Sequence, residues 1–267
     1  MALRRHRERP HLESHIEVEK HLRGLPRMIP FGIPEAYIGG GQSKLKFLGL
    51  KVPQIRKALK HPFSFSDLPK GEAIEIWTQI FFATDIYEVM SMPLGWVEGL
   101  RKKQSILEFW PELRKWSARV DNWAHADDLS KTYAVIIEEA PGRVLPTLKI
   151  WNRSRKPWLR RLSVVSLICY AGLRKKVLPF GTLMSFVLPL LDDPDRYVQK
   201  GVGWTLREIG TVYPDQTWEF LKKNIKRIRP AAFQATTERL TVARKREIKG
   251  RRALIPKKIG LAKMSQI

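Results

Sequence analysis

The sequence predicts an all-α protein folded as an α-α superhelix, a HEAT-like repeat solenoid with a concave basic groove. Apolar residues recur at helical spacing from Phe47 to Glu247, and no stretch alternates with period two for long. Helical segments are separated by short turns marked by Pro or Gly, and pairs of segments recur roughly every 35–45 residues. In a solenoid each helix pair buries its apolar face only against its neighbours. Because internal self-similarity is weak, an ordinary globular all-α fold remains the alternative.

The N-terminal stretch differs from the rest of the chain. Residues 13–25 are compatible with a helix, but Pro26, Pro30, Pro34 and the three glycines at 39–41 break regular structure after it. We therefore expect residues 1–46 to form an N-terminal arm that is only partly helical.

Helices are expected in unbroken succession from there. Pro53 begins one with Ile55 and Ala58 on one face, and Pro157 suits the first turn of another. The strongest helix is predicted at 121–139, where Asp121 or Asn122 can cap it. The other expected helices cover 71–82, 86–98, 104–116, 144–151, 157–170, 180–191, 194–212, 216–228 and 230–247.

The chain is expected to divide into the arm, a solenoid domain at 47–247 and a basic C-terminal tail at 248–267. From Arg244 to Ile267 there are nine basic residues and one acidic residue, interrupted by Gly250, Pro256 and Gly260. Such a tail is able to lie along phosphates, or it is simply solvated.

The net charge is the strongest compositional signal. The chain carries 49 Lys and Arg against 26 Asp and Glu, which gives +23. A polyanionic partner such as a nucleic acid is the simplest explanation, because each phosphate contact releases condensed counterions. A generally basic proteome, a basic tail and a membrane-surface partner are the alternatives.

Several classes are excluded by what the sequence lacks. The single cysteine, Cys169, excludes an internal disulfide and a Cys-rich zinc site. The histidines His6, His11, His15 and His21 match no compact zinc motif. No secretory signal and no run of about 18 apolar residues is present. We expect an intracellular monomer, cytoplasmic or nucleoid-associated if bacterial, with no metal and no cofactor.

Three segments carry candidate chemistry, the first around Trp123 and Asp127. These residues are four apart and share one helix face, whereas Asp128 points about 100° away. A carboxylate beside an indole can stabilise a cation in a water-poor cleft. The alternative is a core tryptophan and a solvated or capping aspartate.

The second segment places Arg160 and Arg161 before an almost wholly apolar helix, so one of them lies near a buried face. A guanidinium near that face can bind a phosphate through two hydrogen bonds. The alternative is a structural salt bridge to the preceding helix. In the third segment Gly201 and Gly203 each cost roughly 1 kcal/mol of helix stability relative to Ala. They suit a ligand that approaches the backbone beside Trp204, or close packing between helices.

In this order and at these separations, the segments resemble the AlkD-type DNA alkylation repair glycosylases. The family's Trp-x-x-x-Asp pair is matched by Trp123 and Asp127, and its Trp-x-x-Arg segment by Trp158 and Arg161. Its Gln-Lys-x-x-Gly-Trp-x-Leu-Arg-Glu segment is matched by residues 199–208, and an upstream Phe-Leu-Gly-x-x-x-Pro by residues 47–53. The resemblance extends over about residues 47–228.

The resemblance implies an enzyme that excises cationic N-alkylated purines, such as 3-methyladenine and 7-methylguanine, from double-stranded DNA. It also implies that the solenoid grips the DNA backbone and has no base-flipping pocket. Asp127 is expected to stabilise positive charge on the sugar and to orient water, with Trp123 and Trp204 flanking the deoxyribose. Because no lysine stands in these motifs, Schiff-base lyase chemistry is not indicated.

Phosphate contacts are expected from Arg161, Arg160, Lys51 and Lys200. Two non-catalytic alternatives remain open. One is a HEAT-repeat DNA-binding protein that recognises DNA shape, and the other is a HEAT scaffold whose basic face binds acidic proteins. The scaffold hypothesis predicts that the two tryptophans, the aspartate and Arg161 are buried in separate places.

Overall fold

The computed structural model describes residues 9–38 and 43–254. Within these residues there is no β-strand, only an isolated parallel bridge between Lys46 and Ile86. The α-helices are α1 (Arg9–Arg23), α2 (Ile33–Ile38), α3 (Val52–Ala58), α4 (Lys70–Ala83), α5 (Tyr87–Leu100), α6 (Trp110–Trp116), α7 (Trp123–Glu139), α8 (Pro141–Asn152), α9 (Pro157–Val165), α10 (Phe180–Val187), α11 (Arg196–Val212), α12 (Pro214–Asn224), α13 (Pro230–Thr237) and α14 (Val242–Ala253). Short 3-10 helices are η1 (Leu107–Phe109), η2 (Ser117–Arg119), η3 (Ala171–Leu173) and η4 (Leu188–Leu190).

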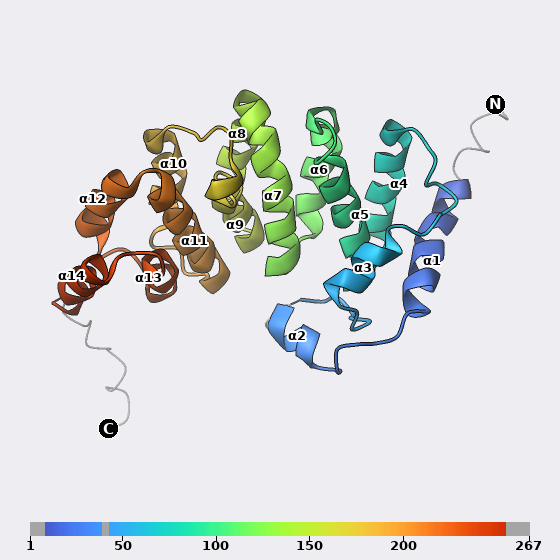
Figure 1. The fold of residues 1–267 in the computed structure, drawn as a ribbon, viewed down its shortest axis with the longest axis horizontal. Coiled ribbons are helices and arrows are strands. Elements are labelled where there is room, and N and C mark those ends of the chain that lie inside the picture. Colours follow the sequence, from blue (N-terminus) through green and yellow to red (C-terminus); the bar gives the residue numbers. More distant parts are fainter. Residues whose placement is uncertain (1–8, 39–42, 255–267) are drawn as a thin grey trace, which may run out of the picture.

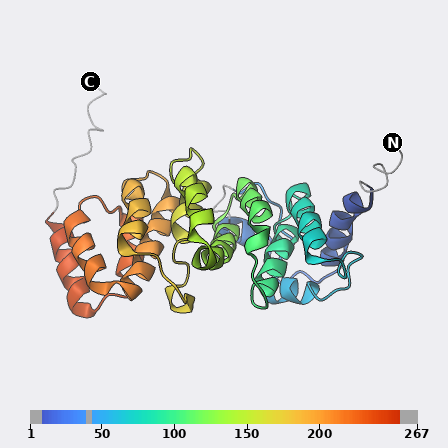
Figure 2. The same cartoon turned by 90° about the horizontal axis from the view of Figure 1, so that it is seen from above.

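The helices stack side by side in chain order along the long axis, in an arch from α1 at one end to α14 at the other (Figure 1). Alternate helices contact one another, so α5, α7, α9, α11 and α13 form one continuous row. Seen from above, the stack is one elongated body (Figure 2). The expected all-α solenoid is confirmed.

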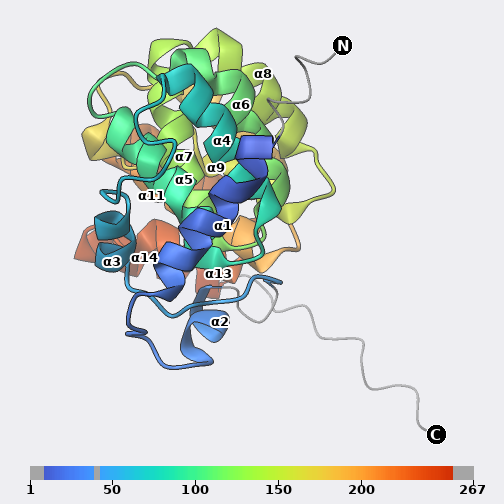
Figure 3. The same cartoon turned by 90° about the vertical axis from the view of Figure 1, so that its right-hand side faces the viewer.

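One apolar core runs through the stack, from Val18 and Leu22 in α1 to Ile248 in α14. Helix α2 is the exception to the stacking. It lies below the row both in the first view and when the molecule is seen from its α1 end (Figure 3). The arm therefore places a helix outside the stack, within the stretch where the prolines and glycines predict a break in regular structure.

Helix starts follow the sequence signals. Pro stands in the first turn of α3, α8, α9, α12 and α13, where its missing N–H costs nothing. Asn122 caps α7, because its side chain accepts the N–H of His125. Asp195 caps α11 by accepting the N–H groups of Tyr197 and Val198.

Helix ends differ from the expectations in several places. The helix expected at 104–116 is a 3-10 turn followed by α6. The helix expected at 157–170 ends at Val165, and Tyr170 adopts a left-handed conformation with φ 55° before η3. The helix expected at 180–191 gives way to η4 after Val187. These helices were predicted to be too long because an apolar run suggests a continuous helix even where the backbone turns.

The single helix expected at 230–247 was wrong, since two helices cover this stretch. Helix α13 ends at Thr237, and Thr241 begins α14 by accepting the N–H of Arg244. Helix α14 then continues to Ala253, so the first part of the expected tail is helical. Residues 255–267 lie outside the described residues, as do the first eight.

Gly201 and Gly203 of α11 are explained by close packing. A Cβ on Gly203 would lie 2.7 Å from Cα of Ala232 in α13. A Cβ on Gly201 would lie 3.1 Å from Cγ of Arg161 and 3.2 Å from Cγ2 of Val165 in α9. Both glycines therefore let neighbouring helices approach, and Gly201 makes room for an arginine.

Candidate functional site

A buried ion pair joins α7 to α9. Arg161 donates to one carboxylate oxygen of Asp127 through Nη2 at 2.7 Å and through Nε at 3.2 Å. Its Nη1 donates to the carbonyl of Tyr197 on α11 at 2.8 Å. Arg161 thus ties three neighbouring helices of the row together, and it is 4% exposed.

The environment of Asp127 perturbs its ionisation. Burial raises the pKa of the Asp127 carboxyl, and the adjacent Arg161 only partly opposes that rise. Removing the carboxylate from water strengthens its interaction with any charge that comes close. A desolvated carboxylate with one specific partner is the kind of group found at functional sites.

A cavity of about 620 Å³ opens beside this pair. Its walls come from helices that are far apart in the sequence. They comprise Ala36 and Tyr37 of α2, Trp123 of α7, Arg161 of α9, and Pro194, Asp195, Arg196, Tyr197 and Lys200 at the start of α11. The lining thus contains three cationic side chains and one carboxylate, that of Asp195, so the cavity favours an anionic ligand.

Trp123 forms the wall nearest α2. Its indole N–H donates to the carbonyl of Tyr37 at 2.9 Å, and the two rings meet edge to face at 5.4 Å. At the start of α11, Tyr197 also lines the cavity, and its ring packs against that of Trp158 with centres 5.0 Å apart. Aromatic side chains of α2, α7 and α11 therefore border the basic cavity.

A buried polar network holds the start of α7 in place. Asn122 donates to Nδ1 of His125 at 3.1 Å, so Nε2 carries the proton and pairs with Ser91 at 3.0 Å. The imidazole also stacks on Tyr87, with ring centres 4.5 Å apart. Burial lowers the pKa of His125 to about 4, which keeps the ring neutral. This network fixes the turn from which Trp123 and Asp127 project.

Trp204 lies further along α11 and does not line the cavity. Its indole N–H donates to the buried carboxylate of Glu208 at 3.1 Å. Its ring meets Tyr170 edge to face at 5.4 Å. The structure therefore pairs Asp127 with Arg161 and places Arg161 and Trp123 in the cavity wall, whereas Asp127 itself is not a lining residue and Trp204 belongs to a separate aromatic pair with Tyr170.

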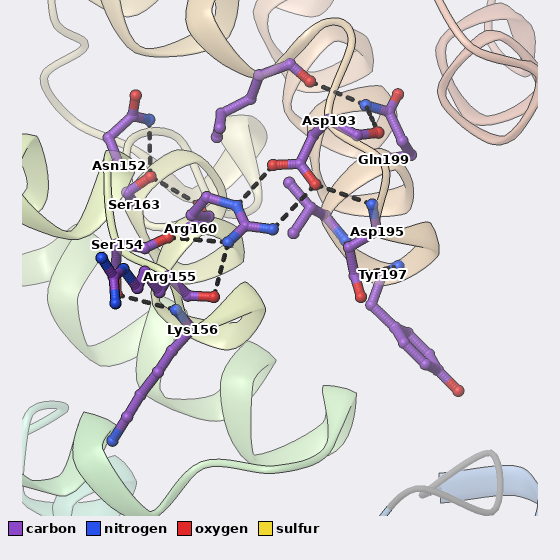
Figure 4. Close-up of polar contacts among 12 residues, drawn as sticks. Asn152, Ser154, Arg155, Lys156, Arg160, Ser163, Asp193, Asp195, Tyr197 and Gln199 are labelled. Atoms are coloured by element: carbon purple, nitrogen blue, oxygen red, sulfur yellow. Dashed lines mark hydrogen bonds and ion pairs between the residues drawn. The ribbon is translucent and has the colours of Figure 1, made fainter.

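Arg160 has structural partners. Its guanidinium binds both carboxylate oxygens of Asp193, at 2.6 Å and 3.1 Å, and donates to the carbonyls of Ser154 and Arg155 (Figure 4). These bonds engage four of its five N–H donors. The network fastens the start of α9 to the turn before α11, while Tyr197 points away from it (Figure 4). We therefore do not retain Arg160 as a phosphate ligand.

The two expected lysines lie in different places. Lys200 is exposed and lines the cavity, with Nζ 5.8 Å from the ring centre of Tyr197. Lys51 is exposed at the start of α3, outside the cavity lining. The segment before it is fixed by Glu88, which accepts the N–H groups of Leu48 and Gly49 at 2.9 Å and 2.8 Å. Lys51 thus belongs to a separate part of the surface.

Sequence reasoning missed Tyr37 and Arg196 as cavity residues. Tyr37 stands in a Pro- and Gly-rich stretch that carried no motif, and only the fold brings it to α7. Arg196 begins α11, and the one available signal was its position beside Tyr197, which shares a helix face with Gly201 and Trp204.

The described residues contain no cluster of three or more His, Cys, Asp or Glu that would hold a metal ion. The side chains of His6 and His11 lie outside the described part, and His21 stacks on His61 at 4.0 Å. Among the helices of the described residues, none has the length and apolar character to cross a membrane.

Comparison with known proteins gives consistent matches. A protein-family model described as DNA alkylation repair enzyme matches residues 17–240. A solved structure described as a predicted DNA alkylation repair enzyme from Enterococcus faecalis is 15% identical, with a TM-score of 0.64 over 82% of this chain and 99% of that one. AlkD2 from Streptococcus mutans is 15% identical, with a TM-score of 0.53 over 87% and 100%. No curated protein matches the chain. At this identity the two structures establish a shared fold.

Proposed function

The chain belongs to the DNA alkylation repair enzyme family, and from this membership we propose that it is a monofunctional DNA glycosylase. Its proposed reaction is hydrolysis of the N-glycosidic bond of cationic N-alkylated purines, such as 3-methyladenine and 7-methylguanine, in duplex DNA. The observation that carries the proposal is Asp127, a buried carboxylate paired with Arg161, and Arg161 in turn lines a basic cavity together with Trp123.

The chemistry requires little more than charge stabilisation. An N-alkylated purine is cationic and therefore a good leaving group. When the bond between C1′ and the purine nitrogen breaks, its electron pair leaves with the base, which departs neutral. The positive charge moves to the sugar, and water then adds to C1′ and loses a proton. A fixed negative charge near the sugar favours the transition state, because positive charge develops toward it.

Asp127 is the group proposed to supply that negative charge. It is held by Arg161, so little reorganisation is needed when the sugar becomes cationic. Its second carboxylate oxygen takes no part in the bonds to Arg161, and it is available to orient the attacking water. Trp123, at the same face of α7, offers a π surface to the cationic centre.

The basic residues around the cavity are proposed to hold the DNA backbone. Arg161 has two N–H donors left after its bonds to Asp127 and Tyr197. Lys200 and Arg196 are exposed at the same cavity and suit phosphate oxygens. DNA is the partner that family membership implies, and this cavity is its proposed contact nearest the lesion.

A non-catalytic DNA-binding role is the second candidate. It is favoured by the ion pair itself, because Asp127 and Arg161 neutralise each other and tie adjacent helices together. A non-catalytic DNA-binding protein would need the ion pair for stability and would bind DNA through the remaining cationic side chains.

Release of free base separates the two roles. Duplex DNA alkylated with a methylating agent is incubated with the protein, and the supernatant is analysed for 3-methyladenine and 7-methylguanine by chromatography. A glycosylase releases free alkylpurine faster than the protein-free reaction does. Tight binding without release would favour the non-catalytic role.

A further inference from the structure

Tyr170 has an unusual backbone conformation. It is the one non-glycine residue in the described part of the chain with a positive φ, at φ 55° and ψ 70°. An aromatic L-residue is strained in this region, and such strain persists only where the surrounding structure imposes it. The turn that Tyr170 makes ends the apolar stretch after α9 and leads into η3.

The strained turn presents the tyrosine ring to two helices of the row. The ring meets Trp204 of α11 edge to face, with centres 5.4 Å apart. The ammonium group of Lys131 on α7 lies 5.5 Å from the ring centre. Even with these neighbours, 41% of Tyr170 is exposed. Part of an aromatic surface is therefore open to a ligand.

Lys131, which contacts the ring of Tyr170, lies one helical turn after the proposed catalytic carboxylate of Asp127. Lys131 follows Asp127 by four residues, and Trp123 precedes it by four, so all three lie on one face of the helix. The carboxylates of Asp127 and Asp128 lie near enough to help raise the pKa of the Tyr170 hydroxyl, which burial raises most. Trp123 thus stands one turn before Asp127, and the ring of Tyr170 adjoins the turn after it.

Glu208 holds this arrangement. One of its carboxylate oxygens accepts the N–H of Ala171, directly after Tyr170, at 2.9 Å. The other accepts the indole N–H of Trp204 at 3.1 Å. Arg239 pairs with the same carboxylate at 3.1 Å. A buried anion therefore locks both the strained turn and its aromatic partner.

We infer that Tyr170 is a substrate-contacting residue, whose open ring surface packs against the damaged nucleotide on the side of Asp127 opposite Trp123. The inference rests on the proposed function and extends it, because none of the sequence motifs includes Tyr170. A π surface attracts a cationic base or sugar, and nucleotide rings and sugars stack on aromatic side chains without regard to sequence. Tyr170 and Trp204 together form the second aromatic wall of the lesion site.

Substitution of Tyr170 by glycine tests the contact of the ring with the nucleotide without adding backbone strain. Glycine adopts a positive φ freely, so Tyr170→Gly removes the ring and relieves the backbone at once. We expect its melting temperature to stay within about 4 °C of the wild type, while single-turnover release of alkylpurine slows about tenfold or more. Tyr170→Phe keeps the ring and is expected to slow release much less. Leu173→Ala, at an exposed position of the same turn, is the matched control.

Two further measurements exclude an indirect effect and test the contact independently of catalysis. Tyr170→Gly is expected to slow release in the Trp204→Ala background as well, since the ring itself touches the nucleotide. It is also expected to lower the preference for a duplex with a tetrahydrofuran abasic site over an intact duplex, as measured by fluorescence anisotropy. An unchanged preference, or no added effect in the Trp204→Ala background, would overturn the inference. If the wild type releases no alkylpurine, the proposed function fails, and the binding preference still decides the role of Tyr170.

Discussion

At the residue scale, Asp127 and Asp128 are adjacent on α7 but occupy different environments. The Asp127 side chain is 15% exposed and pairs with Arg161 of another helix. The Asp128 side chain is 44% exposed and pairs with Lys131 on its own helix at 2.8 Å. Exposed pairs within one helix contribute little, whereas a desolvated carboxylate interacts strongly with nearby charge. This contrast makes the two residues a matched pair for substitution.

Asp127→Asn is expected to slow excision by roughly 10–1000-fold. The amide keeps the shape of the carboxylate but removes its charge, and about 1.4–4 kcal/mol of transition-state stabilisation is lost. Binding to undamaged DNA is expected to hold or to tighten slightly, because one carboxylate no longer repels phosphate. Single-turnover release of alkylpurine and anisotropy with intact duplex measure the two effects.

Asp128→Asn is the control and is expected to change excision little. Impaired excision by Asp128→Asn together with normal excision by Asp127→Asn would place the catalytic carboxylate one residue further along. Normal excision by both would remove the electrostatic mechanism.

His125 makes the stability of the protein depend on pH. Its pKa is about 4 in the folded chain and near 6.5 when unfolded, so the folded state favours the neutral ring. Between these values the unfolded chain binds a proton that the folded chain does not. The free energy of unfolding therefore falls by roughly 3 kcal/mol as the pH decreases from 6.5 to 4.

Urea unfolding of the wild type and of His125→Gln at pH 7 and pH 4.5 measures this contribution. Glutamine does not titrate, so the variant is expected to lose less stability on acidification than the wild type, although it starts lower at pH 7. Equal losses in both proteins would show that other groups cause the acid sensitivity.

At the element scale, the approach of α13 to α11 depends on one glycine. A Cβ at position 203 would lie 2.7 Å from Cα of Ala232 and 2.9 Å from Cβ of Ala235. Gly203→Ala is therefore expected to destabilise the protein by about 1–3 kcal/mol, because backbone and not a flexible side chain must move. Chemical denaturation followed by circular dichroism measures the loss.

Gly250→Ala in α14 is the matched control for that substitution. No atom lies within 4 Å of a Cβ built there, so alanine is expected to be neutral or to stabilise the helix by up to about 1 kcal/mol. Equal effects of the two substitutions would mean that helix propensity, and not packing, governs Gly203.

Helix starts could be predicted from the sequence more reliably than helix ends. Proline in the first turn and the Asn122 cap are local signals, and local interactions decide them. The turn that follows α9 could not be predicted, because the N–H of Ala171, directly after Tyr170, is bound by Glu208, which lies 37 positions later in the chain. Helix α2 could not be predicted either, because it packs through Tyr37 against Trp123, which is distant in the sequence.

At the scale of the whole molecule, the candidate site combines what motifs predict with what only folding assembles. Trp123, Asp127 and Arg161 were predicted from their spacing and resemblance, and the structure pairs Asp127 with Arg161 and places Arg161 and Trp123 at one cavity. The sequence could not decide between Arg160 and Arg161, because adjacent residues on a helix differ by about 100° in direction. Only the fold shows that Arg160 faces Asp193 and that Arg161 faces the cavity.

The overall charge predicts how DNA binding responds to salt. With a net charge of +23, binding is expected to weaken roughly tenfold or more between 50 and 200 mM salt, with little dependence on DNA sequence. Lys200→Ala is expected to lower the slope of log Kd against log salt by about one. Anisotropy titrations on two unrelated duplexes provide both numbers. Affinity that barely changes with salt would contradict phosphate-dominated binding.

Cleavage of the glycosidic bond of alkylated purines is the activity proposed for this chain, and single-turnover base release measures it without an intervening step. Methylated duplex is mixed with excess protein, and free alkylpurine, abasic sites and strand breaks are quantified over time. We expect free base and abasic sites to appear together in equal amounts, and strands to break only after alkali treatment, because hydrolysis leaves an intact backbone. DNA that is fully bound yet releases no base above the protein-free rate would contradict it.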